Sequence, residues 1–423
     1  MPSAFSRRVA VVAAATLVTA CHSAGVVPSG ASQPDSAAIQ RDIVYLASEQ
    51  LAGRLTGTPG NDSAAAYIAR RYAALGLTAA APMYLQRFTA RPPAHAGQGV
   101  SLPTQNVFAV LPGRDPALRG EYIVVGAHFD HLGNSTDGAL DPDSHAVRRG
   151  ADDNASGTAA VMELARLFAH APARRSIIFV NFSGEEEGLL GSSYFADHSP
   201  VPIDSIYTML NFDMVGRLRN DKLIVYGIAT ATEFPALLDS ANSATHLRIA
   251  GQGDGFGPSD HSSFYAKNIP VLHFFTDLHD DYHRATDTPE KINSGGEARV
   301  VALAERVVRA VADRPGRLTF VRVAAPVQSA GSGSDVYLGT IPDMAGGDTP
   351  GLRITGVRAG SPAELGGLKA DDVIVEFDGK PVKDLYQYSE ALYARKPGDV
   401  VSVVVLRGGQ RVPLNVKLGK RGS

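Results

Sequence analysis

The chain lacks tryptophan and has a single cysteine, Cys21, among its 423 residues. One cysteine cannot form an intramolecular disulfide, so the fold must depend on a hydrophobic core, and 44% of the residues are hydrophobic. The chain also lacks a strong excess of either charge: its formal net charge is −3, which is not typical of a nucleic-acid-binding protein. We therefore expect no nucleic acid among its partners, and a globular protein whose length allows two or three domains.

An apolar stretch near the start predicts export. Arg7-Arg8 is followed by Val9–Ala20, a pattern typical of a secretory signal peptide. The stretch is too short to span a bilayer, because a membrane-spanning helix needs about 20 apolar residues. It ends in Leu17-Val18-Thr19-Ala20-Cys21, which resembles a bacterial lipobox. The resemblance implies that Cys21 is lipidated and becomes the first residue of the mature chain.

We accordingly expect a lipoprotein signal peptide and lipobox over residues 1–21. A flexible tether is expected over residues 22–35, where serine, glycine, proline and alanine are frequent. The protein would then lie at the bacterial cell envelope, lipid-anchored to the membrane through Cys21 and facing the periplasm, or be secreted. A signal peptide cleaved nearby, with Cys21 unmodified, is the alternative.

Over residues 36–313, apolar runs rich in β-branched residues alternate with helical patterns. Helices are predicted within 36–77, apart from a turn-rich loop at 53–60, and over 158–169, 233–242 and 296–313. Strands are predicted over Gln105–Leu111, Tyr122–His128, Ser176–Phe182, Tyr207–Phe212, Lys222–Tyr226 and Pro270–Phe275. The alternation indicates an α/β fold, a three-layer α/β/α sandwich with a mostly parallel central sheet. Active sites of such sheets lie in loops beyond the carboxyl ends of the strands.

Residues 314–334 interrupt this pattern. They contain Pro315, Pro326 and the run Ser329–Ser334, which consists of serine, glycine and alanine. This composition predicts a linker.

A second, small β-rich unit is predicted over residues 335–423. Its motifs resemble those of a PDZ domain, and they are Gly351–Val357, Gly360–Glu364, Gly367–Ile374 and Phe377–Gly379. The resemblance implies that Val336–Ile341 receives the C-terminus of a peptide or protein, which would add a strand to a sheet edge. A folded spacer without a ligand is the alternative.

Five short segments carry carboxylate or imidazole side chains, most of them close behind an apolar run. They are His128-Phe129-Asp130, Asp152-Asp153-Asn154, Glu185-Glu186, Asp213 and His283. Two divalent metals about 3.5–4 Å apart need a shared carboxylate, further ligands for each ion, and a base for the water between them. Together the five segments supply this set and indicate a two-metal hydrolase.

Each segment alone also permits a structural role. His128 is expected as a ligand oriented by Asp130, which lies two residues further on the same strand face, but a hydrogen-bonded structural histidine is the alternative. Asp153 is the expected bridging ligand, with Asp152 as the alternative candidate, although both acids could simply cap the helix that follows. Of Glu185 and Glu186, one can bind metal while its neighbour acts as general base, and a solvated acidic turn is the alternative.

In combination, the motifs resemble those of the M28 family of metallopeptidases over about residues 36–313. They are His-x-Asp, Gly-Ala-Asp-Asp-Asn-Ala-Ser-Gly, Glu-Glu-x-Gly-Leu-x-Gly-Ser, Asp-Met and His-x-x-x-Asp-Thr. The resemblance implies a zinc-exopeptidase fold, two zinc ions, and peptide substrates with a free amino terminus, from which residues are removed one at a time. It also implies the following ligands and base: His128 and Asp213 for one zinc, Glu186 and His283 for the other, Asp153 as the bridge, and Glu185 as the general base.

The resemblance implies three further features. Glu187 would lie outside the site, and the peptide bond between Asp153 and Asn154 would be cis. Some family members stabilise the oxyanion with a tyrosine three residues before Ser-Asp-His, where this chain has Phe256. Others use a tyrosine immediately before the last ligand histidine, which here is Tyr282, so we expect Tyr282 to have this role.

Other outcomes stay open at this point. A carboxypeptidase or dipeptidase could be built on the same fold, and a catalytically inactive protein could act through its PDZ domain. A glutaminyl cyclase of this fold uses one zinc, and the complete ligand set argues against it. The acidic loop Asp137–Asp143 is expected to be solvated rather than to bind calcium.

Overall fold

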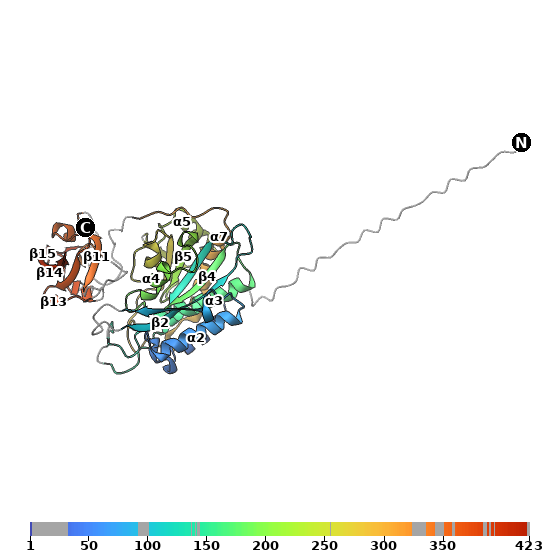
Figure 1. Ribbon diagram of the computed structural model, residues 1–423, viewed down its shortest axis with the longest axis horizontal. Helices are drawn as coiled ribbons and strands as arrows, with labels where there is room; N and C mark the ends of the chain where they lie inside the picture. Colours follow the sequence, from blue (N-terminus) through green and yellow to red (C-terminus); the bar gives the residue numbers. More distant parts are fainter. Residues whose placement is uncertain are drawn as a thin grey trace.

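A computed structural model describes Met1 and residues 33–91, 101–323 and 336–420, apart from 137, 140, 142–143, 254, 343–350, 358–359, 384–386, 389–390 and 393 (Figure 1). The lipobox with Cys21, nearly all of the predicted signal peptide and most of the tether therefore lie outside the described residues. No helix in the described ranges has the length and apolar character needed to cross a membrane.

The larger unit has a mixed central sheet. Within the described residues its eight strands follow the order β1-β2-β4-β3-β5-β8-β6-β7. The strands are β1 (Leu85–Ala90), β2 (Leu102–Leu111), β3 (Tyr122–His128), β4 (Ser176–Phe182), β5 (Ile206–Phe212), β6 (Lys222–Tyr226), β7 (Arg248–Gly251) and β8 (Val271–Phe275). Parallel pairing joins β4, β3, β5 and β8 at the centre, whereas β1, β2 and β6 add antiparallel pairs toward the edges.

Both faces of the central strands are buried, because their side chains alternate between two cores. In β3, Ile123 and Val125 join the core on one face, while Val124 joins the core on the other. In β4, Phe179 and Val180 divide between the same two cores. The apolar runs in the sequence therefore mark strands that are covered by helices on both sides.

Helices complete the sandwich. They are α1 (Ser36–Leu46), α2 (Pro59–Ala74), α3 (Gly157–His170), α4 (Leu190–Asp197), α5 (Phe234–Asn242), α6 (His261–Tyr265) and α7 (Ser294–Asp313). Residues of α1, α2, α3, α5 and α7 belong to the larger core, and residues of α4 and α6 belong to the core on the opposite face (Figure 1). This arrangement confirms the predicted α/β/α sandwich.

Local signals explain where several helices begin. The Asp35 carboxylate accepts hydrogen bonds from the backbone amides of Ala37 and Ala38, so the last residue assigned to the tether is the cap of α1. The Thr58 hydroxyl accepts from the amide of Asn61 at the start of α2. Such caps satisfy amides that have no partner inside the helix.

The larger unit extends past the boundary predicted at residue 313. Leu318 is buried in the main core, and Phe320 packs against the core of the other face. The backbone amide of Val321 donates to the carbonyl of Thr230. The prediction of a linker over 314–334 is therefore wrong for its first ten residues, because Leu318 and Phe320 anchor this segment despite Pro315 and Gly316.

The C-terminal unit has a hydrophobic core of its own. Its described strands are β9 (Val336–Tyr337), β10 (Thr340–Pro342), β11 (Leu352–Val357), β12 (Val373–Phe377), β13 (Lys380–Pro381), β14 (Val400–Arg407), β15 (Gln410–Lys417) and β16 (Gly419–Lys420), with the short helix α8 (Pro362–Leu365). The strand β10 pairs with β11 and stands at the end of the sheet order β10-β11-β12-β14-β15. The segment that was expected to receive a chain terminus thus includes an edge strand.

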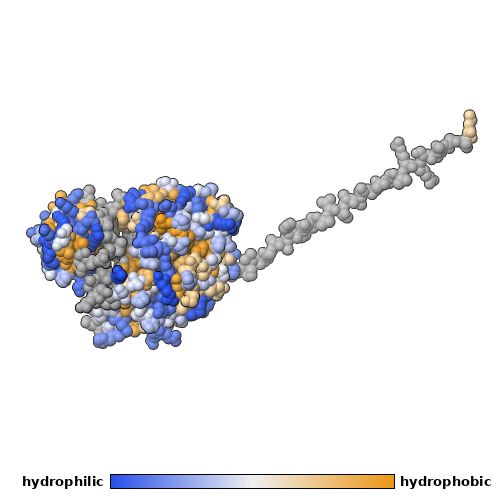
Figure 2. Space-filling view, in the orientation of Figure 1, coloured by the Kyte–Doolittle hydropathy of each residue, from blue (hydrophilic) through white to orange (hydrophobic). Residues whose placement is uncertain are grey.

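On the face of the molecule drawn in Figure 2, hydrophilic and apolar residues are interspersed over the described surface. Single exposed apolar residues of this kind are normal on globular proteins.

Candidate metal centre

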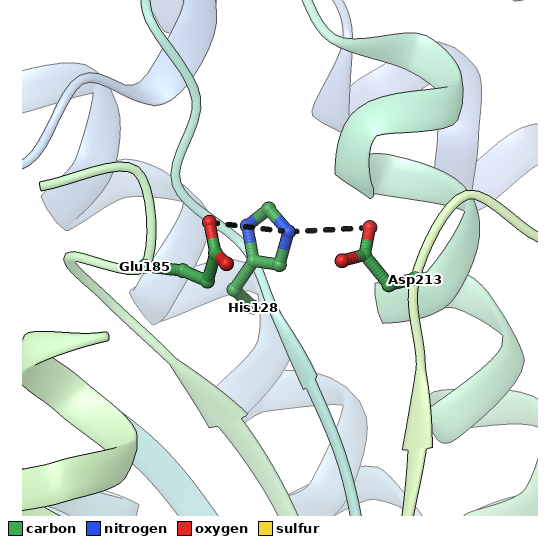
Figure 3. A group of neighbouring side chains, drawn as sticks. All are labelled: His128, Glu185 and Asp213. Carbon is green, nitrogen blue, oxygen red and sulfur yellow. Dashed lines mark ion pairs between the residues drawn. The ribbon is translucent and has the colours of Figure 1, made fainter. Parts of the chain in front are cut away.

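The parallel strands bring the predicted site residues to one edge of the sheet. His128 is the last residue of β3, Glu185 follows β4, and Asp213 directly follows β5. The three strands are neighbours, with His128 paired to Phe182 in the register of β3 and β4. Figure 3 shows the consequence: the His128 ring lies between the carboxylates of Glu185 and Asp213.

The first cluster of possible ligands surrounds His128, which is 1% exposed. Its Nε2 lies 3.4 Å from Oδ1 of Asp213 and 3.5 Å from Oδ1 of Asp153. Oε2 of Glu185 is more distant, at 3.9 Å. The hydroxyl of Ser259 donates to Oδ2 of Asp213 at 2.8 Å, while the buried Oδ1 has no hydrogen-bond partner among the described residues. Asp213 therefore keeps one oxygen directed at His128 and available to a cation.

The second cluster shares Asp153 with the first. Nε2 of His283 lies 3.2 Å from Oδ2 of Asp153 and 3.2 Å from Oε2 of Glu186. The other ring nitrogen of His283 lies 2.8 Å from the carbonyl oxygen of Gly138. A backbone acceptor at that distance requires a proton on Nδ1 and leaves Nε2 free as a ligand.

Asp153 is held between the clusters by its backbone. It lies in the irregular turn η4 (Ala151–Ser156), and its peptide bond to Asn154 is cis, as the family resemblance implied. The amides of Asp152 and Asp153 both donate to Oδ2 of Asp287, at 2.9 and 3.1 Å. This carboxylate fixes the turn, so that the two oxygens of Asp153 face different histidines.

Zinc dimensions provide a test of whether these residues fit metal. Ligand bonds of about 2.0–2.2 Å in a tetrahedral site separate two donor atoms by about 3.3 Å. The four contacts of His128 and His283 with Asp153, Asp213 and Glu186 measure 3.2–3.5 Å. The donor set therefore fits two zinc ions that share Asp153. The contact of Glu185 is longer than such an edge, at 3.9 Å, although its carboxylate also lies within reach of a cation held by His128 and Asp213.

Charge in the site also favours cations. Burial raises the pKa of Glu185 well above its usual range, and the neighbouring carboxylates Glu186, Asp260 and Asp213 add to this effect. Although burial opposes ionisation of Glu186 as well, His283 and His131 hold its pKa well below its usual range. The carboxylates thus outnumber the positive groups that stabilise them, which is the condition that bound dications relieve.

Asp130 differs from the expectation. Its carboxylate lies 3.8 Å from Nδ1 of His128, beyond hydrogen-bond distance. Instead it accepts from the backbone amides of Glu185 and Glu186, both at 3.3 Å. Since β3 ends at His128, the two-residue alternation of a strand no longer directs the carboxylate of Asp130 at that ring. The carboxylate orients the loop that carries Glu185 and Glu186, while the backbone carbonyl oxygen of Asp130 lies 3.3 Å from Nδ1 of His128.

Tyr282 and Phe256 occupy different surroundings. Tyr282 stacks on His283 with ring centroids 3.8 Å apart, and it lines a cavity of about 120 Å³ together with Asp153 and Glu185. Phe256 packs edge-on against Tyr265, with centroids 4.8 Å apart. Tyr282 therefore lines the cavity and carries a hydroxyl, whereas Phe256 has no hydroxyl and is not among the lining residues.

The cavity has an aromatic wall. The ring centroids of Tyr226, His273 and Phe275 are separated by 5.4–6.5 Å. His261 stacks on His273, with ring centroids 4.5 Å apart. Leu278 also lines the cavity and is 50% exposed. The cavity thus has a lining of aromatic and apolar side chains beside the candidate ligands.

Two further buried residues, Arg54 and His131, belong to the site and are not among the residues expected from the sequence. Arg54 is fully buried, and its guanidinium donates to the carbonyl oxygens of Phe129, Arg149, Gly150 and Leu46, which ties together the segments that carry the ligands. His131 is also fully buried, and its Nδ1 lies 2.7 Å from Oε1 of Glu186. An imidazole directly after Asp130 was the available signal for His131.

Of the aspartates in the acidic loop 137–143, Asp141 is the one that lies within the described residues. Its Oδ1 accepts from Arg148 at 2.6 Å, and its Oδ2 accepts from the amide of Ala285 at 2.9 Å. The rest of the expectation about calcium falls largely on undescribed residues.

Comparison with known proteins assigns the two units to families. Residues 106–308 match the family model of peptidase family M28, and residues 334–418 match that of the PDZ domain. The chain therefore contains an M28 peptidase domain followed by a PDZ domain, and both resemblances are confirmed.

Two curated relatives show the extent of the similarity. A probable zinc metalloprotease of Pyrenophora teres f. teres is 33% identical over 151 residues, which are 35% of this chain and 31% of that protein. Aminopeptidase YwaD of Bacillus subtilis is 30% identical over 166 residues, 36% of this chain and 35% of that protein. The chain thus spans about a third of the length of these curated relatives.

A solved structure extends the likeness of the fold. An aminopeptidase from Aneurinibacillus sp. strain AM-1 superposes with a TM-score of 0.53 over 70% of this chain and 98% of that chain, at 20% identity. The larger unit therefore has the fold of that aminopeptidase, a zinc-exopeptidase fold as predicted.

Proposed function

We propose that the protein is a metal-dependent aminopeptidase that uses two zinc ions to remove amino-terminal residues from peptides. The observation that carries this proposal is the position of Asp153, whose two carboxylate oxygens lie 3.5 and 3.2 Å from His128 and His283. A shared carboxylate of this kind is the central requirement of a two-metal hydrolase.

The proposed ligand sets follow the distances. His128 and Asp213 would hold one zinc, Glu186 and His283 would hold the other, and Asp153 would belong to both. When bound, two zinc ions lower the pKa of a shared water from about 15.7 toward about 7 and polarise the scissile carbonyl.

Glu185 would act as general base. Its Oε2 lies 3.9 Å from Nε2 of His128, so it borders the ligand cluster without belonging to it. In this role it takes the proton of the attacking water and later delivers it to the departing amine. Asp130, through the amides of Glu185 and Glu186, keeps the base and the adjacent ligand in place.

Tyr282 would stabilise the oxyanion with its hydroxyl. Burial raises the pKa of Tyr282 well above its usual range, and Asp153 adds to this effect, so the phenol keeps its proton and can donate it in a hydrogen bond. The Tyr282 ring stacks on His283, which holds the hydroxyl close to the second ligand cluster.

Two observations support amino-terminal specificity. The relatives named above include two aminopeptidases, and a cavity of about 120 Å³ lies beside the candidate ligands. A free amino terminus would bind next to the acidic cluster, and the first side chain would enter the aromatic-walled cavity.

The terminal regions complete the proposal. Lipidation of Cys21 would anchor the enzyme at the bacterial cell envelope, and the PDZ domain would bind the C-terminus of a peptide or protein along β10 by strand addition. The purified protein, assayed with aminoacyl-p-nitroanilides and analysed for zinc, tests the enzymatic part. Hydrolysis together with two zinc ions per chain supports it, whereas bound metal without hydrolysis of any aminoacyl substrate would favour a binding protein.

A further inference from the structure

His131 lies beside the second ligand cluster without being one of its proposed ligands. The ring is fully buried. Nδ1 lies 2.7 Å from Oε1 of Glu186, and Nε2 has no hydrogen-bond partner among the described residues. The other carboxylate oxygen of Glu186 faces His283 at 3.2 Å. The two carboxylate oxygens of Glu186 thus contact two different imidazoles, those of His131 and His283.

The 2.7 Å distance locates a proton. An oxygen of an ionised carboxylate only accepts hydrogen bonds. If Nδ1 of His131 carried a lone pair, two acceptors would face each other at hydrogen-bond distance, and a buried N–H at Nε2 would have no acceptor. With the proton on Nδ1, the contact becomes a charge-assisted hydrogen bond of ordinary length. His131 therefore donates to Glu186.

The same distance excludes Nδ1 as a co-ligand of Glu186 Oε1. Two donor atoms on one tetrahedral zinc lie about 3.3 Å apart, and the contacts of His283 with Asp153 and Glu186 meet this value at 3.2 Å. The contact between His131 and Glu186 is shorter by half an ångström, which is the geometry of a hydrogen bond and not of an edge between ligands.

The ring of His131 has little freedom to move. Gly150 has a positive φ of 56°, and a Cβ there would lie 2.4 Å from Cγ of the His131 ring and 2.0 Å from the carbonyl oxygen of Asp153. Only glycine allows this close approach. The turn that carries the bridging Asp153 therefore also packs against the His131 ring.

We infer that His131 is a positioning residue: it binds Oε1 of Glu186 through Nδ1–H, so that Glu186 presents only Oε2 to the second metal. This inference rests on the proposed two-metal site. Without the donor, Oε1 becomes free to rotate or to coordinate, and the affinity for the second metal falls. Residues that orient ligands in this way typically contribute about 10–100-fold to metal affinity.

Two nearly isosteric substitutions separate this role from simple packing. In His131→Asn, the amide nitrogen stands close to the position of Nδ1 and can still donate to Glu186. In His131→Gln, the amide reaches the position of Nε2 instead. His145→Gln serves as the matched control, because His145 is exposed. The measurements on the full chain are zinc content, zinc affinity by chelator competition, and the visible absorption spectrum with cobalt(II).

We expect two zinc ions in the wild-type protein, the Asn variant and the His145 control. In the Gln variant we expect one zinc of unchanged affinity and one weakened about 10–100-fold, with an altered cobalt spectrum. Circular dichroism checks folding, and His131→Phe replaces a Gln variant that does not fold.

Wild-type affinity for both ions in the Gln or Phe variant would overturn the role of His131 while leaving the two-metal site intact. Equal loss in the Asn and Gln variants would overturn it as well. A wild-type protein that binds fewer than two zinc ions would instead overturn the proposed function on which it rests.

Discussion

Asp153 presents Oδ2 to His283 at 3.2 Å, and its other carboxylate oxygen faces a different histidine, His128, at 3.5 Å. Both separations match those of neighbouring donors on a tetrahedral zinc, about 3.3 Å. Removal of this one side chain should therefore affect two ions, whereas removal of a ligand in one cluster should affect one.

The first prediction compares Asp153→Ala with Asp213→Ala. Asp213 contacts only the His128 cluster through its free Oδ1, so Asp213→Ala should lose one zinc per chain and Asp153→Ala should lose both. Metal analysis after gel filtration measures this difference. Full zinc occupancy in the Asp153 variant would refute the bridge.

The second prediction concerns the general base. Glu185→Gln should retain both metals, because Glu185 is not a ligand in this assignment, and should reduce turnover by about 10²–10⁴-fold. Glu187→Gln is the matched control. Burial and Asp130 raise the pKa of Glu187 well above its usual range, and its Oε2 accepts from Thr56 at 2.7 Å, so an uncharged amide should substitute for a protonated acid.

Metal content and aminoacyl-p-nitroanilide hydrolysis distinguish the two glutamate variants. Unchanged turnover in Glu185→Gln would remove this residue from its role. A loss of equal size in Glu187→Gln would show that the acidic loop as a whole, and not one base, is required.

The third prediction tests Tyr282. Tyr282→Phe removes the hydroxyl and keeps the ring that stacks on His283. Loss of an oxyanion donor lowers turnover by about 10²–10³-fold, with little change in KM. Tyr226→Phe, which changes the cavity wall, should alter KM more than kcat. If both variants changed only KM, Tyr282 would be a binding residue.

The central strands could be predicted because their signals are local: the runs of β3, β4, β5 and β8 are mostly apolar and buried on both faces. Of the proposed ligands, His128 ends β3 and Asp213 directly follows β5, whereas Asp153 lies in η4 and His283 lies beyond the end of β8. Strands β1 and β7 were missed, since they are partly exposed and carry no continuous apolar run.

The relations between segments were harder to predict. His131 contacts Glu186 across 55 positions of sequence, and Arg54 reaches carbonyl groups up to 96 positions away. The partners of these two side chains therefore do not follow from a local pattern. Asp130 was assigned to His128 on the assumption that strand geometry continued past the last residue of β3. The carboxylate of Asp130 instead accepts hydrogen bonds from the backbone amides of Glu185 and Glu186, which are distant in sequence.

The fourth prediction concerns pH and His261. Burial lowers the pKa of His261 well below its ordinary value of about 6.5, with a further contribution from His273. Below about pH 6.5 the unfolded chain binds a proton at this position and the folded chain does not, so acidification destabilises the fold. As the pH falls, the free energy of unfolding of the wild type should therefore decrease more steeply than that of His261→Phe, by up to about 1.4 kcal/mol per pH unit.

Chemical denaturation of both proteins at pH 7, 6 and 5 measures this difference. The two proteins are compared by how steeply the free energy of unfolding changes with pH. The absolute values are not compared, because the substitution also changes packing against His273 by an amount that is independent of pH. Parallel pH profiles for the two proteins would show that His261 is protonated in the folded state.

The last prediction concerns the end of the peptidase unit. Its core and that of the PDZ domain are separate clusters of residues, so a chain ending at Val323 should fold and hydrolyse small aminoacyl substrates at nearly the wild-type rate. A chain ending at Asp313 also lacks Leu318 and Phe320, which pack on the two faces of the sandwich. Full burial of such a side chain contributes about 1.5–3 kcal/mol, and the partly buried Phe320 adds a smaller amount, so this shorter chain should unfold at a clearly lower denaturant concentration. If instead the chain ending at Val323 were folded but inactive, the PDZ domain would have to contribute directly to the active site.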